Sequence, residues 1–102
     1  MKLIILDKSL LELYESGKSR KYRLPENVLR KFFMRLQQIE AAKTIYDLWK
    51  TPSLRFEHLE GTHSYSMRIT EKWRLEIRIE WDDEEKTTGT VTVTNISNHY
   101  GD

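Results

Sequence analysis

Hydrophobic and polar residues alternate most strictly between residues 65 and 81. Apolar side chains hold every second position on each side of a short break, and they are Met67, Ile69, Trp73, Leu75, Ile77, Ile79 and Trp81. Successive side chains of a strand point to opposite faces of a sheet, so this period predicts a half-buried hairpin with strands over Ser64 to Thr70 and Trp73 to Trp81. We expect the apolar face of this hairpin to pack on a second layer.

Two earlier segments show the three- and four-residue spacing of apolar residues that is typical of helices. The first begins at Asp7 or Ser9, either of which can cap it, and runs to about Glu15 before Gly17 ends it. The second runs from Pro25 to about Ala42. Its apolar stripe is expected to cover the hairpin.

The remaining segments are short. One or two helical turns are expected over Lys43 to Trp49, before Pro52 stops them. Further strands are expected over Lys2 to Leu6, Leu54 to Leu59 and Thr87 to Ile96. This order predicts one α+β domain over residues 1–102, with two layers and helices on one face of a mainly antiparallel sheet.

The last expected strand changes phase along its length. Val91 and Val93 hold one period-two phase, and Ile96 holds the other. A bulge or a strand end near Asn95 explains the change, because one extra residue moves every later side chain to the other face. Such a bulge would change the face of the sheet toward which the side chains of Asn98, His99 and Tyr100 point.

Composition narrows the class of protein. The 102 residues include no cysteine, which excludes a disulfide scaffold and a thiolate zinc site. The N-terminal apolar run stops at Asp7, too early for a signal peptide, and no later run approaches the roughly 18 apolar residues that a membrane helix needs. We therefore expect a cytoplasmic protein that makes no contact with a membrane.

The charge is unevenly distributed along the chain. Residues 1–51 contain 11 Lys and Arg against 6 Asp and Glu, whereas residues 52–102 contain 6 against 10. Such a basic half could present a surface to nucleic acid, although many solvated helical surfaces look the same. The basic residues that cluster there are Lys18, Arg20, Lys21, Arg23, Arg30, Lys31 and Arg35.

Several chemistries are excluded by missing motifs. The chain has no GxxxxGK[ST], GxGxxG, GxSxG or HExxH motif, so nucleotide-driven chemistry is not expected. His58 and His63 lie five residues apart across Gly61, in an expected turn and not at a metal-ligand spacing on one element. We expect neither a metal nor a cofactor.

Arginines gather on the polar face of the predicted hairpin. Arg68, Arg74 and Arg78 alternate with apolar residues, so they project together, and His99 follows the last strand. RNA cleavage without a metal needs a base, an acid and cations that stabilise the charged phosphorane, and these residue types supply those functions. The alternative is a solvated face on which the arginines pair with neighbouring glutamates.

Short motifs in a defined order carry a resemblance to a known family. An L-x-G turn is followed by an S-x-R strand and an x-W-R strand, and the residues concerned are Leu59 with Gly61, Ser66 with Arg68, and Trp73 with Arg74. An amphipathic first helix, a basic connector after Gly17 and the ending NISNHYGD fit the same pattern. In this order the chain resembles the HigB branch of the RelE/ParE toxin superfamily.

The resemblance implies a fold, an activity and partners. The fold would be the RelE-like, microbial-ribonuclease-like one, and the activity that of a ribosome-dependent mRNA interferase, which cuts messages in the decoding site and inhibits translation. It also implies a cognate helix-turn-helix antitoxin that blocks the toxin and represses the operon. Operator DNA would then be reached only through the antitoxin.

Roles for individual residues also follow from the resemblance. Arg68 and Arg74 would contact the scissile phosphate, and His99 would be the acid/base histidine. The residues expected to assist by orientation or proton transfer are Asn98, Tyr100 and Glu57. Six basic residues are too many and too far from His99 in the sequence to serve one phosphate, and those expected to grip ribosomal RNA are Lys18, Arg20, Lys21, Arg23, Arg30 and Lys31.

The chain departs from the family pattern at both parts of the expected site. The aspartate of a D-Y-H ending is absent, and Glu57 and Glu60 stand where other members carry a histidine or a lysine, so Glu57 is a candidate base. Two other functions stay open. One is a ParE-like toxin that inhibits DNA gyrase by binding alone, and the other is an inactive partner-binding domain.

Overall fold

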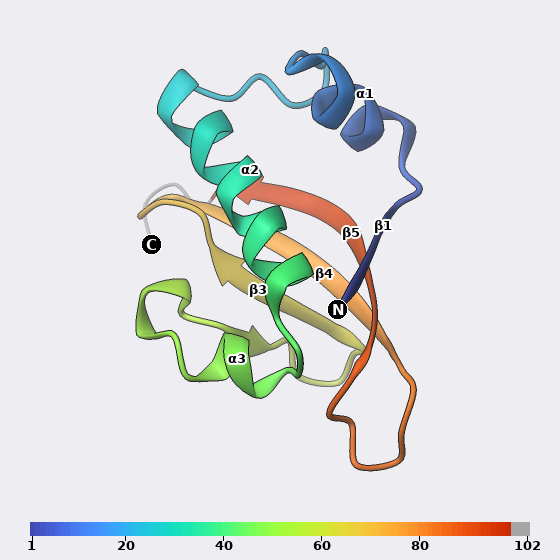
Figure 1. The fold of residues 1–102 in the computed structure, drawn as a ribbon. Coiled ribbons are helices and arrows are strands. Elements are labelled where there is room, and N and C mark those ends of the chain that lie inside the picture. Colours follow the sequence, from blue (N-terminus) through green and yellow to red (C-terminus); the bar gives the residue numbers. More distant parts are fainter. Residues whose placement is uncertain (99–102) are drawn as a thin grey trace.

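In the computed structural model, which describes residues 1–98, helices pack against a mixed five-stranded sheet with the strand order β1-β5-β4-β3-β2 (Figure 1). The strands are β1 (Lys2–Ile5), β2 (Glu57–His58), β3 (Ser64–Arg68), β4 (Trp73–Trp81) and β5 (Gly89–Asn98). The helices are α1 (Lys8–Ser16), α2 (Glu26–Ala41), α3 (Tyr46–Trp49) and the 3-10 turn η1 (Pro52–Leu54). The predicted two-layer α+β fold is confirmed.

The predicted hairpin forms the centre of the sheet. β4 has the predicted bounds, and β3 pairs with it in antiparallel fashion. β3 ends two residues earlier than predicted, because the N–H groups of Ile69 and Thr70 both donate to the Trp73 carbonyl, at 2.8 and 3.1 Å, and close the turn. Among the strands of residues 1–98, β1 alone runs parallel to its neighbour, β5, so the sheet is mainly antiparallel as predicted.

The prediction of a strand from Leu54 to Leu59 is wrong in extent. Pro52 begins η1 instead of only ending the helix before it, and Arg55 follows with a left-handed backbone at φ 44°. A left-handed residue cannot continue an extended strand, so β2 begins only after Arg55, and it pairs with β3 at Glu57 and His58.

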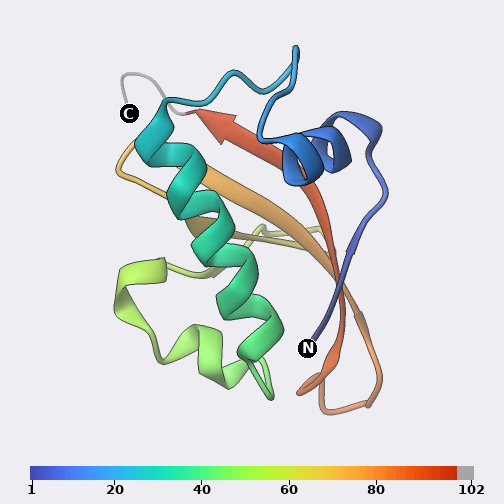
Figure 2. The ribbon, with the colours of Figure 1, turned by 45° about the horizontal axis from the view of Figure 1, so that its top comes forward.

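The first helices begin and end at the predicted signals. The Asp7 side chain accepts the Leu10 N–H at 2.9 Å, and Gly17, at φ 76°, donates its N–H to the Leu13 carbonyl. α2 starts directly after Pro25 and crosses the sheet (Figure 2). Within residues 1–98, none of the helices has the length and apolarity to cross a bilayer.

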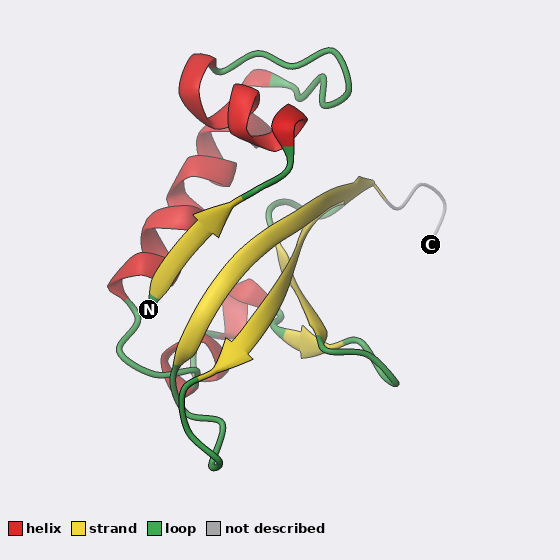
Figure 3. Cartoon of the chain, turned by 90° about the vertical axis from the view of Figure 1, so that its right-hand side faces the viewer, coloured by secondary structure: helices red, strands yellow, loops and turns green. Residues whose placement is uncertain are grey.

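The core lies between α2 and one face of the sheet, and the opposite face carries no helix of the described chain (Figure 3). Phe32 and Ile39 of α2 are fully buried, as are Leu75 and Ile77 of β4. Arg35, expected on the basic surface, is instead buried on the same helix, because it falls within the stripe that faces the sheet.

A bulge interrupts the pairing of β4 with β5. Glu76 pairs with Asn95 and Ile77 pairs with Val93, which leaves Thr94 as the extra residue. The predicted bulge near Asn95 is therefore confirmed. It returns Ile96 to the core face, so later residues of β5 alternate in the shifted phase.

Candidate functional site

The two predicted phosphate-binding arginines lie side by side on the open face of the sheet. Arg68 of β3 and Arg74 of β4 are direct register partners. Residues directly opposite in an antiparallel pair share a face, and both side chains alternate with the buried Met67 and Leu75. The structure therefore brings Arg68 and Arg74 together on the face that α2 leaves uncovered.

The Arg74 guanidinium is held in a fixed orientation. Its Nε donates to the Ser66 hydroxyl at 3.0 Å, and one Nη donates to the Arg55 carbonyl at 2.7 Å. The left-handed backbone of Arg55 belongs to the turn that presents this carbonyl to β4. The other Nη of Arg74 takes part in no hydrogen bond within residues 1–98, so it stays available to an oxyanion.

Glu57, the candidate base, adjoins Arg74. Its Oε1 lies 3.6 Å from an Arg74 Nη and accepts the Ser66 hydroxyl at 3.2 Å. The Glu57 side chain is 59% exposed, whereas that of Arg74 is 18% exposed. A solvent-accessible carboxylate thus stands beside a half-buried, oriented guanidinium, an arrangement that can remove a proton next to a phosphate.

Arg68 is half-buried and is positioned through its backbone. Its carbonyl accepts the Nε of the buried Arg35 at 2.6 Å, and a second Arg35 nitrogen lies 3.4 Å from the Ile69 carbonyl. Burial and, after it, the like charge of Arg68 lower the pKa of the Arg35 guanidinium below its ordinary value. Sequence reasoning missed this support, because Arg35 reads as one more basic surface residue.

Asn98 does not join the arginines. It pairs with Trp73, whose phase along β4 is that of Leu75 and the core, whereas Ser97 pairs with Arg74. The single extra residue of the bulge therefore gives Asn98 the phase of the core face, and its assisting role stays a prediction. Its buried Oδ1 has no hydrogen-bond partner within the described chain. His99 and Tyr100 lie outside the described residues.

The predicted ribosomal-RNA residues occupy the connector between α1 and α2 and the start of α2. Tyr22 anchors this connector, since it is buried and its hydroxyl donates to the Asn95 side chain at 3.0 Å. The connector therefore passes beside the last part of β5. The basic residues of the connector, all exposed, are Lys18, Arg20, Lys21 and Arg23; Arg30 is exposed and Lys31 half-buried on α2.

Two members of the site were not predicted. The alternation of Ser66 with Arg68 was sufficient to place Ser66 on the arginine face, so a sequence signal existed for it. The Arg55 carbonyl had no such signal, because its direction depends on a left-handed backbone at a residue other than glycine.

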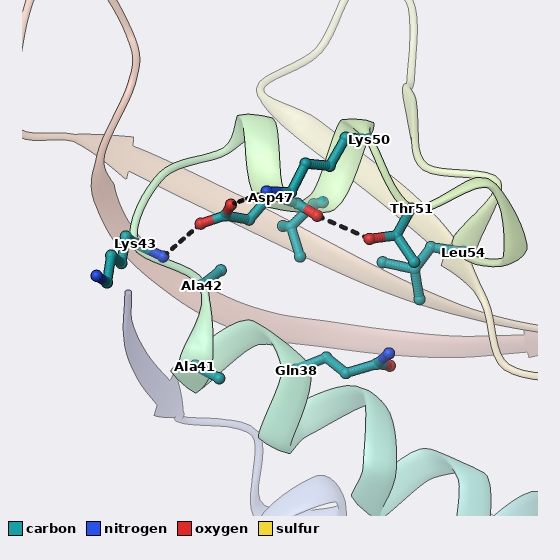
Figure 4. A pocket seen from close by; sticks show the side chains of 9 residues that line it. Gln38, Ala41, Ala42, Lys43, Asp47, Lys50, Thr51 and Leu54 are labelled. Carbon is teal, nitrogen blue, oxygen red and sulfur yellow. Dashed lines mark hydrogen bonds and ion pairs between the residues drawn. The ribbon is translucent and has the colours of Figure 1, made fainter.

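A hollow of about 500 Å³ between the end of α2 and α3 carries a second group of charges (Figure 4). Asp47 accepts the N–H groups of Lys43 and Thr44, at 2.8 and 3.2 Å, and pairs with Lys50 at 3.0 Å. The bond with Lys50 and these backbone donors lower the pKa of Asp47 to about 2. The Asp47 carboxylate is thus fully occupied by Lys50 and by backbone donors, so we assign it a structural role.

Two comparisons of the sequence with known proteins give matches over most of the chain. The sequence profile described as "RelE-like toxin of type II toxin-antitoxin system HigB" matches residues 4–91. The chain is 35% identical over 77 residues to "Toxin HigB-1" of Vibrio cholerae serotype O1 (strain ATCC 39315 / El Tor Inaba N16961), a match that covers 74% of this chain and 80% of the relative.

A solved structure supports the fold. The "YoeB/ParE toxin from Agrobacterium tumefaciens" superposes with a TM-score of 0.57 at 18% identity, over 98% of this chain and 100% of that one. At this identity the likeness speaks for the RelE-like fold alone. Taken with the profile and the Vibrio relative, it leads to one conclusion: the chain belongs to the HigB-like family of RelE-like toxins of type II toxin–antitoxin systems.

Proposed function

We propose that this toxin is a metal-independent endoribonuclease, an mRNA interferase that cuts messages on the ribosome and so inhibits translation. The observation that carries the proposal is the pairing of Arg68 with Arg74 on the open face, with Glu57 3.6 Å from Arg74. Guanidinium groups bind phosphate oxygens through a planar fork of donors. The site thus offers two cations and a proton acceptor on one accessible surface.

The proposed reaction is an internal transfer at one phosphate. A base takes the proton of the 2′-hydroxyl, the 2′-oxygen bonds to phosphorus, and the bond from phosphorus to the 5′-oxygen breaks as an acid protonates that leaving oxygen. The negative charge that develops on the phosphorane lies against Arg74 and Arg68. Glu57 is the candidate base and His99 the candidate acid. The reverse assignment makes His99 the base and Glu57 the acid. Tyr100 is proposed to orient the reacting groups.

Ribosomal RNA is the proposed target of the connector. Its four exposed cations contact no carboxylate within residues 1–98, so they are available to RNA phosphates. The Tyr22 anchor holds the connector beside Asn95 of β5. Contacts there would orient the toxin while Arg74 reaches the message.

Type II toxins act together with an antitoxin, so an antitoxin is a partner of this chain. We propose that this partner is a helix-turn-helix protein that blocks the toxin and represses the shared operon. The toxin would then reach operator DNA only through the antitoxin.

Inducible expression with mapping of the 5′ ends of cellular mRNA tests the proposal. Growth arrest with new 5′ ends at fixed positions within translated codons is the expected result. Growth arrest without new 5′ ends, accompanied by gyrase-dependent DNA breaks, would assign the chain to the ParE-like mode instead. Normal growth of cells that contain folded protein would leave only a partner-binding role.

A further inference from the structure

A cationic hollow of about 390 Å³ lies at the open edge of β3, beside the candidate site. β2 covers only Ser66 and Tyr65 of β3, so the edge beyond them faces α2 and η1. The polar and charged residues that line this hollow are Lys31, Arg35, Ser53, Arg68, Thr70 and Glu71. We call it the edge pocket.

The buried cation of the edge pocket lacks a carboxylate partner. Arg35 is 9% exposed, and its guanidinium bonds the Arg68 and Ile69 carbonyls and the Gln38 side chain, all of which are neutral. The ion pairs within residues 1–98 involve other cations, Lys50 and Arg74. Buried charges are normally paired, so the described chain leaves the charge of Arg35 uncompensated.

Neighbouring groups make this charge imbalance larger. Arg68 and Lys31 add two cations to the same walls, against the single carboxylate of the exposed Glu71. Ser53 and Thr70 contribute hydroxyl donors. Three cations and two hydroxyls around one hollow suit an anion that carries several acceptor oxygens, which is the chemistry of a phosphate.

We propose that the edge pocket binds a phosphodiester of an RNA strand, next to the phosphate held at Arg74; this inference rests on the proposed function. Arg68 connects the two positions, because it is the register partner of Arg74 and also lines the edge pocket. A strand that crosses from β4 to β3 on the open face meets Arg74, then Arg68, and then Lys31 at the edge. Lys31 thereby belongs to the message site and not to the ribosomal-RNA group.

Binding without cleavage tests this site directly. The free toxin, labelled with 15N-arginine, is titrated by NMR with a 2′-O-methyl trinucleotide, which has no 2′-hydroxyl to react. The Nε–H of Arg35 is a suitable probe, since its bond to the Arg68 carbonyl protects it from exchange with solvent. Inorganic phosphate and a glutamate-rich peptide of equal charge are titrated in parallel.

We expect the Arg35 signal to move with the trinucleotide at lower concentration than with inorganic phosphate, and not with the peptide. Lys31→Gln should weaken this binding about tenfold, the scale of one lost charged hydrogen bond. Lys8→Gln, an equal loss of charge from exposed α1, should leave it unchanged. Unaltered backbone amide spectra establish that both variants fold.

Three results would overturn the inference: no movement of the Arg35 signal, equal affinity for inorganic phosphate and the trinucleotide, or a response to the peptide alone, which would assign the edge pocket to a carboxylate of a protein partner. The readout uses neither ribosomes nor cleavage. If the protein binds the trinucleotide but cuts no mRNA, the nuclease proposal is rejected and the RNA site is kept. If it cuts mRNA but the Arg35 signal does not respond to the trinucleotide, the edge pocket alone is rejected.

Discussion

Arg74 and Leu75 are adjacent in sequence, yet they belong to two different surfaces of one strand. Leu75 is fully buried opposite Met67, under α2, whereas Arg74 faces outward opposite Arg68. The first surface is held by apolar packing, and the second by hydrogen bonds that orient a cation. Stability and activity should therefore respond separately to substitutions one residue apart.

The largest effect is expected on the arginine face. Arg74→Ala removes the cation that stabilises the phosphorane, so ribosome-dependent cleavage should fall by about 100- to 1,000-fold, the scale of one lost transition-state donor. The rate of mRNA cleavage under single-turnover conditions measures this loss. Arg78→Ala is the matched control, because Arg78 is an exposed arginine of the same strand and face.

Equal losses in the Arg74 and Arg78 variants would mean that the face acts only through its overall charge. Arg74→Lys sharpens the result further. Lysine keeps the charge but replaces the planar fork of donors with a single ammonium nitrogen, so it should restore only part of the rate.

The core face should show the opposite behaviour. Leu75→Ala leaves a cavity beneath α2 and should lower the free energy of unfolding by about 2–5 kcal/mol, measured in urea. The cleavage rate per folded molecule should stay near that of the wild type. Glu80→Ala, an exposed change on the same strand, should alter stability by no more than about 0.5 kcal/mol. A large loss of rate in folded Leu75→Ala protein would show that the two faces are coupled.

The two faces also differ in how well the sequence predicts them. Period-two alternation predicts β4 and the shared face of Arg68 and Arg74, because the direction of a strand side chain depends on local geometry. The side taken by Asn98 depends on which residue is extra at the bulge, and that choice is made by the pairing with β4.

Tertiary contacts decide the parts of the site that were missed. Arg35 is buried because α2 lies against the end of β3, where the carbonyls of Arg68 and Ile69 need donors. β2 begins later than predicted because Arg55 has a left-handed backbone after η1. Helical spacing places Arg35 within the buried stripe of α2, but its carbonyl partners leave no pattern in the sequence, and neither does the left-handed backbone of Arg55.

A smaller effect is expected from the connector. Replacing Lys18, Arg20 and Lys21 with glutamine should weaken ribosome binding and reduce the slope of log affinity against log salt by up to about 0.7–0.9 per lost phosphate contact. Lys2, Lys8 and Lys43, changed together, form a control of equal charge. The same salt slope in both triple variants would mean that the connector makes no specific RNA contacts.

The smallest effect concerns Asp47, which lies on neither face. Because its folded-state pKa is about 2, below the ordinary 3.8, its contribution to stability is complete above about pH 4 and is lost as the pH falls through 2. Asp47→Asn should therefore flatten the decline in unfolding free energy between pH 4 and pH 2, measured in urea, and leave cleavage at neutral pH unchanged. An equally steep decline in the variant would assign the acid sensitivity to other carboxylates.

Cleavage of a defined message on purified ribosomes tests the central claim most directly. The wild-type toxin should cut a message programmed into the ribosomal decoding site at one position and leave the same naked message intact, and His99→Ala should slow the cut by about 100-fold or more while retaining ribosome binding. An intact message on ribosomes that have bound the wild-type toxin would contradict the assignment of the arginine face as an RNA-cleaving site.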